Sequence, residues 1–209
     1  MPSVDGCMWT APFGLWAITA PIAAHLTTGL VNADSWATDF HKWLNVPYDS
    51  GLALVRDAEA LRAAMAITAE YLPTHSPFRN PSDYTPELSR RARGVEVWAA
   101  LRSLGRSGVI ELVERSCRQA RRFAEGLRSA GYEVINEVVL NQVLVVFGDA
   151  ETTHSVVTEL QTEGTCWCGV TVWQGRTAMR ISVSSWATTD VDVERSLDAM
   201  LRIARKYCL

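Results

Sequence analysis

The strongest constraint on the fold is the order of apolar patterns in the second half of the chain. Residues 108–130 carry apolar side chains at helical spacing, and Gly131 follows them as a C-terminal stop. The elements expected after this helix are a strand over 138–148, a helix over 152–163, a hairpin turning at Gln174-Gly175-Arg176 and a helix from Thr189. This order predicts a small α+β domain over residues 107–209.

The first half of the chain is typical of the end of a larger α/β sheet. Residues 13–31 contain few charges, which predicts a mostly buried helix that Pro21 kinks or restarts. The elements expected after it are strands over 34–40 and 51–57, a helix over 58–68, a proline-rich loop over 72–86 and a helical segment from Glu87. Residues 1–106 are therefore expected to belong to a larger domain.

The composition excludes several classes of partner. Hydrophobic residues make up 48% of the chain, charged residues 21%, and the net charge is −3, so no general attraction to nucleic acid or an anionic membrane is expected. No apolar run reaches the ~18 residues of a membrane span, and residues 13–31 are interrupted by Pro21 and His25. No Lys or Arg precedes that segment, which argues against a signal peptide, and we expect a cytoplasmic location.

The five cysteines are an odd and scattered set, which does not predict a disulfide framework. Cys166-Trp167-Cys168 is the one close pair. A structural zinc site needs four ligands, and no second Cys or His pair lies nearby in the sequence. No metal is therefore expected.

Lys42 is one of only two lysines, the other being Lys206. It follows a predicted strand and precedes Trp43. Partial burial of an amine lowers its pKa, and the neutral amine is the form that attacks a carbonyl, so Lys42 is a candidate Schiff-base residue. Considered alone, Lys42 is more typical of a solvated charge at a strand end than of a covalent anchor.

The surrounding segment "ADSWATDFHKWLNVPYDSG" resembles the signature of pyridoxal-phosphate-dependent decarboxylases of the aromatic-amino-acid and glutamate decarboxylase type. The matching residues are Asp34-Ser35, His41-Lys42-Trp43-Leu44, Pro47 and Ser50. The resemblance implies the α/β architecture of fold type I, the aspartate aminotransferase-like transferases. It also implies that Lys42 carries pyridoxal phosphate and that His41 lies beside the cofactor, near its phosphate.

Two further matches have the family's order and spacing. "SVDG", residues 3–6, resembles the strand end whose aspartate pairs with the pyridine nitrogen, which implies that role for Asp5. Tyr71 lies 29 positions after Lys42 (71 − 42) and resembles the loop tyrosine that returns a proton to Cα. Tyr84 is a rival for that role. Structural readings, a turn or cap acid for Asp5 and a core tyrosine for Tyr71, stay open.

Arg180 has two readings. It lies in "MRISVSS", a segment that fits the family's small domain, and could meet a substrate carboxylate or form a structural ion pair.

The chain departs from the family pattern at its beginning. Family members carry a long half before the "VDG" strand, and that half supplies most of the phosphate loop, the aromatic residue that stacks on the cofactor and dimer-forming helices. No Gly/Ser/Thr-rich loop precedes Asp5, and Cys7 to Pro12 form an insertion. The resemblance therefore covers the C-terminal half of such an enzyme and predicts a chain truncated at its N-terminus.

The expected reaction is decarboxylation of an L-amino acid to an amine and CO₂, within a homodimer by resemblance. An aminotransferase of the same fold, with Lys42 as the proton shuttle and no role for Tyr71, is one alternative. A non-catalytic fragment is the other.

Overall fold

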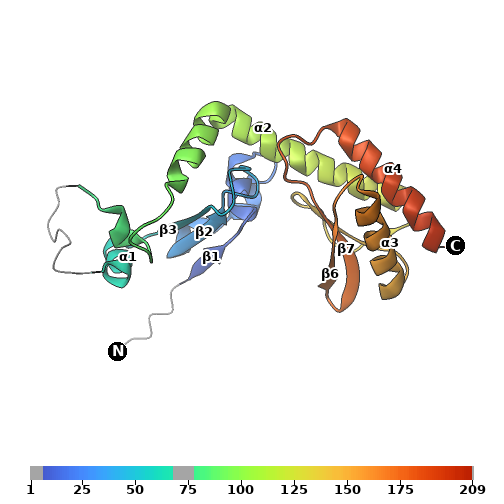
Figure 1. The fold of residues 1–209 in the computed structure, drawn as a ribbon, viewed down its shortest axis with the longest axis horizontal. Helices are drawn as coiled ribbons and strands as arrows, with labels where there is room; N and C mark the ends of the chain where they lie inside the picture. Colours follow the sequence, from blue (N-terminus) through green and yellow to red (C-terminus); the bar gives the residue numbers. More distant parts are fainter. Residues whose placement is uncertain (1–6, 68–77, 209) are drawn as a thin grey trace.

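The computed structural model describes residues 7–67 and 78–208. These residues form two parts that helix α2 (Arg93–Ser129) joins (Figure 1). The first part holds a three-stranded sheet in the order β1-β2-β3, with β1 (Met8–Thr10), β2 (Ser35–Asp39) and β3 (Gly51–Val55). β1 runs parallel to β2, and β3 runs antiparallel to it. The strands predicted over 34–40 and 51–57 are confirmed.

The helix predicted over residues 13–31, kinked or restarted at Pro21, is wrong. Three short 3₁₀ helices occupy this stretch: η1 (Gly14–Thr19), η2 (Ala24–Thr27) and η3 (Leu30–Asn32). Threonine hydroxyls compete with helix propagation, because Thr19 Oγ1 donates to Trp16 O at 2.7 Å and so closes the turn locally. Pro21 has no backbone N–H to donate to a helical hydrogen bond. Gly29 takes a left-handed φ of 84°, which also interrupts a helix. The segment is not mostly buried: Trp16, Ala17, Ala20 and Ala23 are buried, whereas Ile18, Ile22 and Val31 are at least half exposed.

Helix α1 (Ala58–Met65) confirms the helix predicted after β3. The Asp57 side chain caps it, accepting from the backbone N–H groups of Glu59 and Ala60 at 3.0 Å. The short helix η4 (Pro81–Tyr84) lies in the later part of the predicted proline-rich loop. Arg62 of α1 forms a 3.4 Å ion pair with Asp83 of η4, and so holds that loop against α1.

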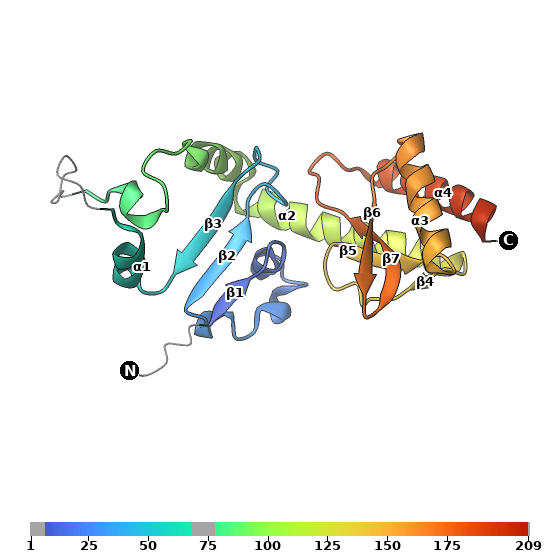
Figure 2. The same cartoon turned by 60° about the horizontal axis from the view of Figure 1, so that its bottom comes forward.

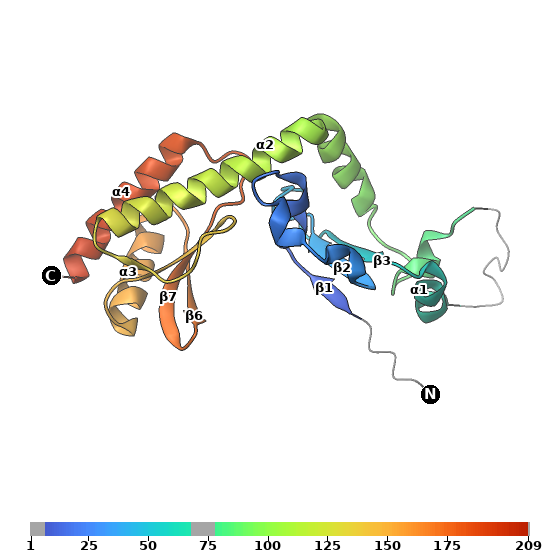
Figure 3. The same cartoon turned by 180° about the vertical axis from the view of Figure 1, so that it is seen from behind.

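Helix α2 bends at Gly105, whose φ of 61° and ψ of −176° are not helical. A side chain disfavours this backbone conformation, so glycine is required at the bend. Viewed from behind, the helix runs from the first sheet to the second part of the chain (Figure 3). The amphipathic helix predicted over 108–130 is confirmed as the portion of α2 after the bend.

The second part is a four-stranded antiparallel sheet covered by helices on one face (Figure 2). Its strands, in the spatial order β4-β5-β7-β6, are β4 (Glu133–Val134), β5 (Gln142–Val146), β7 (Arg176–Ser182) and β6 (Gly169–Trp173). Helices α3 (Ala150–Glu163) and α4 (Asp190–Tyr207) pack with α2 over a core that contains Val143, Val145 and Met179. The predicted strand, helix, hairpin and helix are confirmed.

Local signals explain the ends of these elements. A capping box between Thr189 and Asp192 starts α4. Gly164 takes a left-handed conformation at the end of α3. Gln174 and Gly175 both have positive φ, 49° and 76°, as a two-residue hairpin turn requires.

A second hydrophobic core lies between the two parts. Trp43 is 1% exposed and packs edge-on against Phe13, with ring centroids 5.4 Å apart. Leu112 and Val113 of α2 belong to the same cluster. The loop that carries Lys42 is therefore anchored where the first sheet meets α2.

Candidate functional site

Lys42 lies on the loop between β2 and β3. The base of this loop is closed by a hydrogen bond from Phe40 N to Ser50 O at 2.9 Å. The neighbouring side chain of Trp43 is buried in the second core, and this fixes the backbone beside Lys42. Lys42 itself keeps a side chain that is 37% exposed, so its amine remains open to a small molecule.

The Lys42 amine has two neighbours within its own part of the fold. Its Nζ lies 2.5 Å from Asp39 Oδ2, in an ion pair whose carboxylate side chain is 28% exposed. It also lies 5.7 Å from the centroid of the Phe13 ring, within cation–π range. A pair this exposed contributes ~0–1 kcal/mol to stability, so its main effect is to orient the amine.

The amine borders a cavity of about 750 Å³ between the two parts of the molecule. Its wall comes from Pro12, Phe13 and Gly14, from Lys42, from residues between Asn136 and Gln142, and from Arg180, Ser182 and Ser184. A cavity of this size matches the usual range for small-molecule sites, about 300–1,000 Å³. The contributing elements are far apart in sequence, so only the folded chain assembles this wall.

Arg180 reaches this cavity from β7. Its neighbours Met179 and Ile181 are buried under the helices, so Arg180 lies on the opposite face of the sheet, because side chains alternate along a strand. Within the described residues, Arg180 forms no ion pair of 4.0 Å or less, and its predicted structural ion pair finds no support there. Its guanidinium is available to an anion in the Lys42 cavity.

Asn141 is a further polar residue of the cavity wall, and the sequence reasoning missed it. It is 0% exposed, and its Nδ2 donates to Val183 O at 2.9 Å. Its Oδ1 is buried and has no hydrogen-bond partner among the described residues. Since a buried acceptor without a donor is costly, this oxygen is suited to a donor from a bound molecule. The only sequence signal is the pair of amides, Asn141 and Gln142, inside the apolar run 138–147.

His41 lies next to Lys42 in the chain but borders a different cavity, also of about 750 Å³. Its ring is fixed by the backbone of Ser50, whose N–H donates to Nδ1 at 3.0 Å and whose oxygen lies 2.7 Å from the same atom. The ring also packs against Tyr48, with centroids 4.2 Å apart. Asp39 borders this second cavity and pairs with Lys42, so it connects the Lys42 amine to the His41 cavity.

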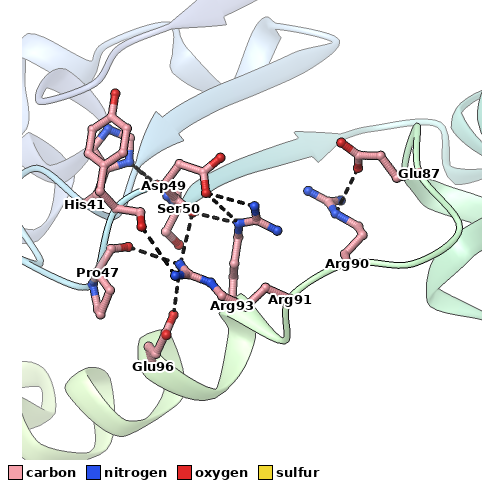
Figure 4. A network of polar contacts seen from close by, with 10 residues as sticks. His41, Pro47, Asp49, Ser50, Glu87, Arg90, Arg91, Arg93 and Glu96 are labelled. Atoms are coloured by element: carbon pink, nitrogen blue, oxygen red, sulfur yellow. Dashed lines mark hydrogen bonds and ion pairs between the residues drawn. The ribbon is translucent and has the colours of Figure 1, made fainter.

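Arg91, just before α2, and Arg93, its first residue, hold the loop that follows Lys42 (Figure 4). Arg93 donates to Asp49 O at 2.7 Å and to Asp49 Oδ1 at 2.8 Å. Arg91 donates to the carbonyl of Tyr48 at 3.3 Å and pairs with Glu96 at 3.5 Å. The hydrogen bond from Arg93 holds the pKa of Asp49 below its ordinary value. The sequence alone does not reveal the loop partners of these arginines, Tyr48 and Asp49, because they lie more than 40 positions earlier.

The remaining predicted site residues divide into two groups. Asp5 and Tyr71 lie outside the described residues. Tyr84, the rival of Tyr71, borders the His41 cavity, and the guanidinium of Arg79 lies 4.2 Å from its ring centroid. Tyr84 is therefore not at the Lys42 cavity.

The described ranges, 7–67 and 78–208, show neither a metal-binding cluster nor a membrane-spanning helix. They contain no group of three or more His, Cys, Asp or Glu side chains that could hold a metal ion. No helix in the same ranges has the length and apolar character needed to cross a membrane.

The fold and the cavity together define a class of protein: an α/β protein in which a lysine amine borders a small-molecule site. A family model described as "Pyridoxal-dependent decarboxylase conserved domain" matches residues 11–148. The chain therefore belongs to the pyridoxal-dependent decarboxylase family, and the predicted family is confirmed. The predicted cofactor, pyridoxal phosphate, is confirmed with it, because the cofactor defines the family.

Curated proteins that are similar in sequence to this chain are named as amino-acid decarboxylases. A histidine decarboxylase of Drosophila melanogaster is 30% identical over 182 residues, which are 84% of this chain and 21% of the relative. An L-2,4-diaminobutyrate decarboxylase of Rhizobium meliloti is 29% identical over 191 residues, which are 85% of this chain and 38% of the relative. The chain thus spans well under half the length of these relatives.

Solved structures confirm the predicted fold. The crystal structure of Oryza sativa TDC with PLP and tryptamine matches with a TM-score of 0.89 at 21% identity, over 97% of this chain and 45% of that one. Catharanthus roseus tryptophan decarboxylase in complex with L-tryptophan gives 0.83 at 21% identity, over 96% and 44%. The chain has the fold type I architecture of these proteins, over a little under half of their length.

Proposed function

We propose that this chain forms the lysine-bearing part of a pyridoxal-phosphate-dependent decarboxylase that converts an L-amino acid to its amine and CO₂. The observation that carries the proposal is the shared cavity of Lys42 and Arg180, reached from opposite parts of the fold. To bind an amino acid beside this cofactor, a site needs two groups. One is an amine that reacts with the cofactor's aldehyde, and the other is a guanidinium that binds the substrate carboxylate.

The residues present fit the cofactor at the Lys42 cavity. Lys42 is the primary amine that would hold it covalently, and the unpartnered Asn141 Oδ1 is an acceptor for one of its donors or the substrate's. Pyridoxal phosphate, when bound, supplies an electron sink for the electrons that remain at Cα as CO₂ departs. Asp39 orients the Lys42 amine, because the two groups are paired at 2.5 Å.

Arg180 is proposed to hold the substrate carboxylate. A guanidinium binds a carboxylate through two parallel hydrogen bonds, which fixes the orientation of the carboxylate as well as its position. Three features support this role: Arg180 is exposed, it borders the Lys42 cavity, and no carboxylate among the described residues is paired with it. An orientation fixed from β7 leaves the amino group of the substrate free to approach Lys42.

The other residue roles rest on the family resemblance. Asp5 is proposed to pair with the pyridine nitrogen and Tyr71 to return a proton to Cα. His41 is proposed to lie near the cofactor phosphate, and its fixed ring supports a binding role. The division into residues 1–106 and 107–209 is proposed with them, since the bend of α2 at Gly105 supports a boundary there.

A homodimer in the cytoplasm is the proposed setting. The three-stranded sheet supports burial against further protein, because the described part of the chain leaves Met8 62% exposed and Leu54 45% exposed. Exposed apolar side chains on a sheet are suited to burial against a further protein surface.

The test is a product analysis with a matched pair of lysine variants. The purified chain is incubated with pyridoxal phosphate and candidate L-amino acids, and CO₂, amine and keto acid are measured. We expect amine and CO₂ in equal amounts from the wild type and from Lys206→Arg, and none from Lys42→Arg. Keto acid without CO₂ would point to the aminotransferase alternative, and no product from any variant despite cofactor binding would contradict the proposed reaction for this chain.

A further inference from the structure

Glu137 is a carboxylate in the wall of the Lys42 cavity that the proposed reaction does not use. Its side chain is exposed and forms no ion pair of 4.0 Å or less within the described part of the chain. Arg180 of the same wall is also unpaired there, whereas the charge of Lys42 is matched by Asp39. The cavity therefore presents one cation and one anion that do not neutralise each other.

The loop between β4 and β5 holds the backbone of Glu137 in place. Asn136 Nδ2 donates to the carbonyl of Glu137 and to that of Gln142, each at 3.1 Å. Asn136 Oδ1 accepts from Leu144 N at 2.8 Å. Val139 N donates to the Glu137 carbonyl at 3.1 Å as well. The position of this carboxylate is therefore tied to β5, while its oxygens have no partner among the described residues.

Two strand spacings separate the Glu137 segment from Arg180. Ile135 N donates to Leu144 O at 2.9 Å, and Leu144 lies opposite Arg180 in the pairing of β5 with β7. Neighbouring strands lie about 4.8 Å apart, so the backbones of Ile135 and Arg180 are about 10 Å apart. Glu137 follows Ile135 by two residues on the β4 side. A small molecule in the cavity can therefore contact both charges, one from each side.

Asn141 adds a second acceptor to the same loop. Its Nδ2 is used by Val183 O at 2.9 Å, which orients the amide, and its buried Oδ1 has no partner among the described residues. A buried acceptor of this kind calls for a donor. A protonated amine carries three N–H donors, so it can donate to the Glu137 carboxylate and the Asn141 oxygen at once.

Other side chains of a substrate suit this wall less well. Phe13 is the one aromatic residue that the described part of the chain contributes to it, and the Phe13 ring already contacts Trp43 and the Lys42 amine. An aromatic hydrocarbon side chain would leave Asn141 Oδ1 without a donor. An acidic side chain would meet the like charge of Glu137. A cationic side chain satisfies both acceptors.

We propose that Glu137 and Asn141 select an L-amino acid whose side chain ends in a protonated amine. Glu137 and Asn141 Oδ1 accept hydrogen bonds from that ammonium, while Arg180 holds the α-carboxylate. The inference rests on the proposed function, because that function supplies the amino acid and the role of Arg180. It makes Glu137 a specificity residue that contacts the substrate at the end remote from the reacting carbon.

The first measurement is binding to the cofactor-free chain, by saturation-transfer NMR titration with L-ornithine and L-norleucine. These two amino acids differ in the terminal ammonium, which a methyl group replaces in L-norleucine. The wild type should bind L-ornithine at least about fivefold more tightly. Glu137→Gln should lose this preference by weakening L-ornithine alone. Glu133→Gln is the matched control and should keep it, because Glu133 pairs with Arg176 outside the cavity.

A charge reversal and a product assay complete the test. Glu137 is exposed, so Glu137→Lys should keep the fold, and it should turn the binding preference from L-ornithine to L-glutamate. Equal amine and CO₂ from L-norleucine and L-ornithine in cofactor-loaded wild type and Glu137→Gln would overturn the inference and leave the proposed reaction intact. Preferential binding of L-ornithine without CO₂ from any amino acid would support the inference and contradict the reaction. A wild type that binds no amino acid would overturn both.

Discussion

The side-chain amide of Asn45 donates to the backbone carbonyl of Ser184 at 2.7 Å, across 139 positions of sequence. Its Nδ2 also lies 2.7 Å from the carbonyl of Lys42, and its Oδ1 accepts from Trp186 N at 3.2 Å. One side chain therefore joins the lysine loop to the segment after β7. Because Ser184 and Lys42 border the same cavity, this link fixes the cavity's two walls relative to each other.

We predict that Asn45→Gly and Asn45→Ala together distinguish two contributions of Asn45 to stability: its side-chain hydrogen bonds and its left-handed backbone conformation. Asn45 has a φ of 53°, which glycine adopts freely and alanine does not. Loss of the hydrogen bonds should cost both variants ~1–2 kcal/mol of unfolding free energy, and alanine should lose about 1 kcal/mol more. Urea unfolding measures both. An Asn45→Ala chain as stable as Asn45→Gly would show that the left-handed conformation is not retained.

Arg180→Gln should weaken binding of an amino-acid carboxylate to the cofactor-loaded chain. A charge-assisted hydrogen bond contributes ~1.5–3 kcal/mol, so the dissociation constant should rise about tenfold or more. Arg176→Gln is the matched control, because Arg176 lies on the same strand and pairs with Glu133 at 2.6 Å instead. Titration monitored by cofactor absorbance compares the two. An equal effect of both variants would mean that Arg180 has no special contact with the substrate.

Asp49 should titrate below its ordinary range because Arg93 donates to it. A carboxyl whose folded pKa is lowered contributes stability that is present above its unfolded value and is lost as the pH falls through the folded value. Arg93→Gln should therefore raise the Asp49 pKa toward 3.8, its reference value. NMR titration of the carboxyl carbon measures this directly. An unchanged Asp49 pKa in Arg93→Gln would rule out this pairing in solution.

Gly105→Ala should destabilise the chain through backbone conformation alone. An added Cβ meets no atom within 4 Å there, but the φ of 61° with ψ of −176° suits glycine. The cost should be of order 1–3 kcal/mol. Gly94→Ala, in the first turn of the same helix and equally open, should instead be neutral or stabilising. Thermal unfolding separates the two, and similar melting temperatures for both variants would contradict a fixed bend at Gly105.

The parts of the fold that local signals encode were predictable. Asp149 and Thr189 cap α3 and α4, and Gln174-Gly175 turns the hairpin, so those boundaries follow from neighbouring residues. The segment over 13–31 was not predictable from its apolar pattern, because threonine hydroxyls such as Thr19 close 3₁₀ turns that hydrophobicity does not encode.

The candidate site was predictable only in part. Lys42 stands out by its rarity and by its family-like context, whereas the meeting of Lys42 with Arg180 depends on tertiary packing. Asn45 and Asn141 carry no local signal for their roles, since each acts on a backbone group far along the chain. Long-range hydrogen bonds of this kind require the folded structure.

The most direct test of the central claim is to identify the lysine that takes the cofactor. The chain is incubated with pyridoxal phosphate, reduced with borohydride, digested and mapped by mass spectrometry. Lys206 is an internal control, because it is the other lysine in the sequence and pairs with Glu159 on α3, outside the Lys42 cavity. We expect saturable labelling of Lys42 and none above background on Lys206. Equal labelling of both lysines, or no label on Lys42 at millimolar cofactor, would contradict it.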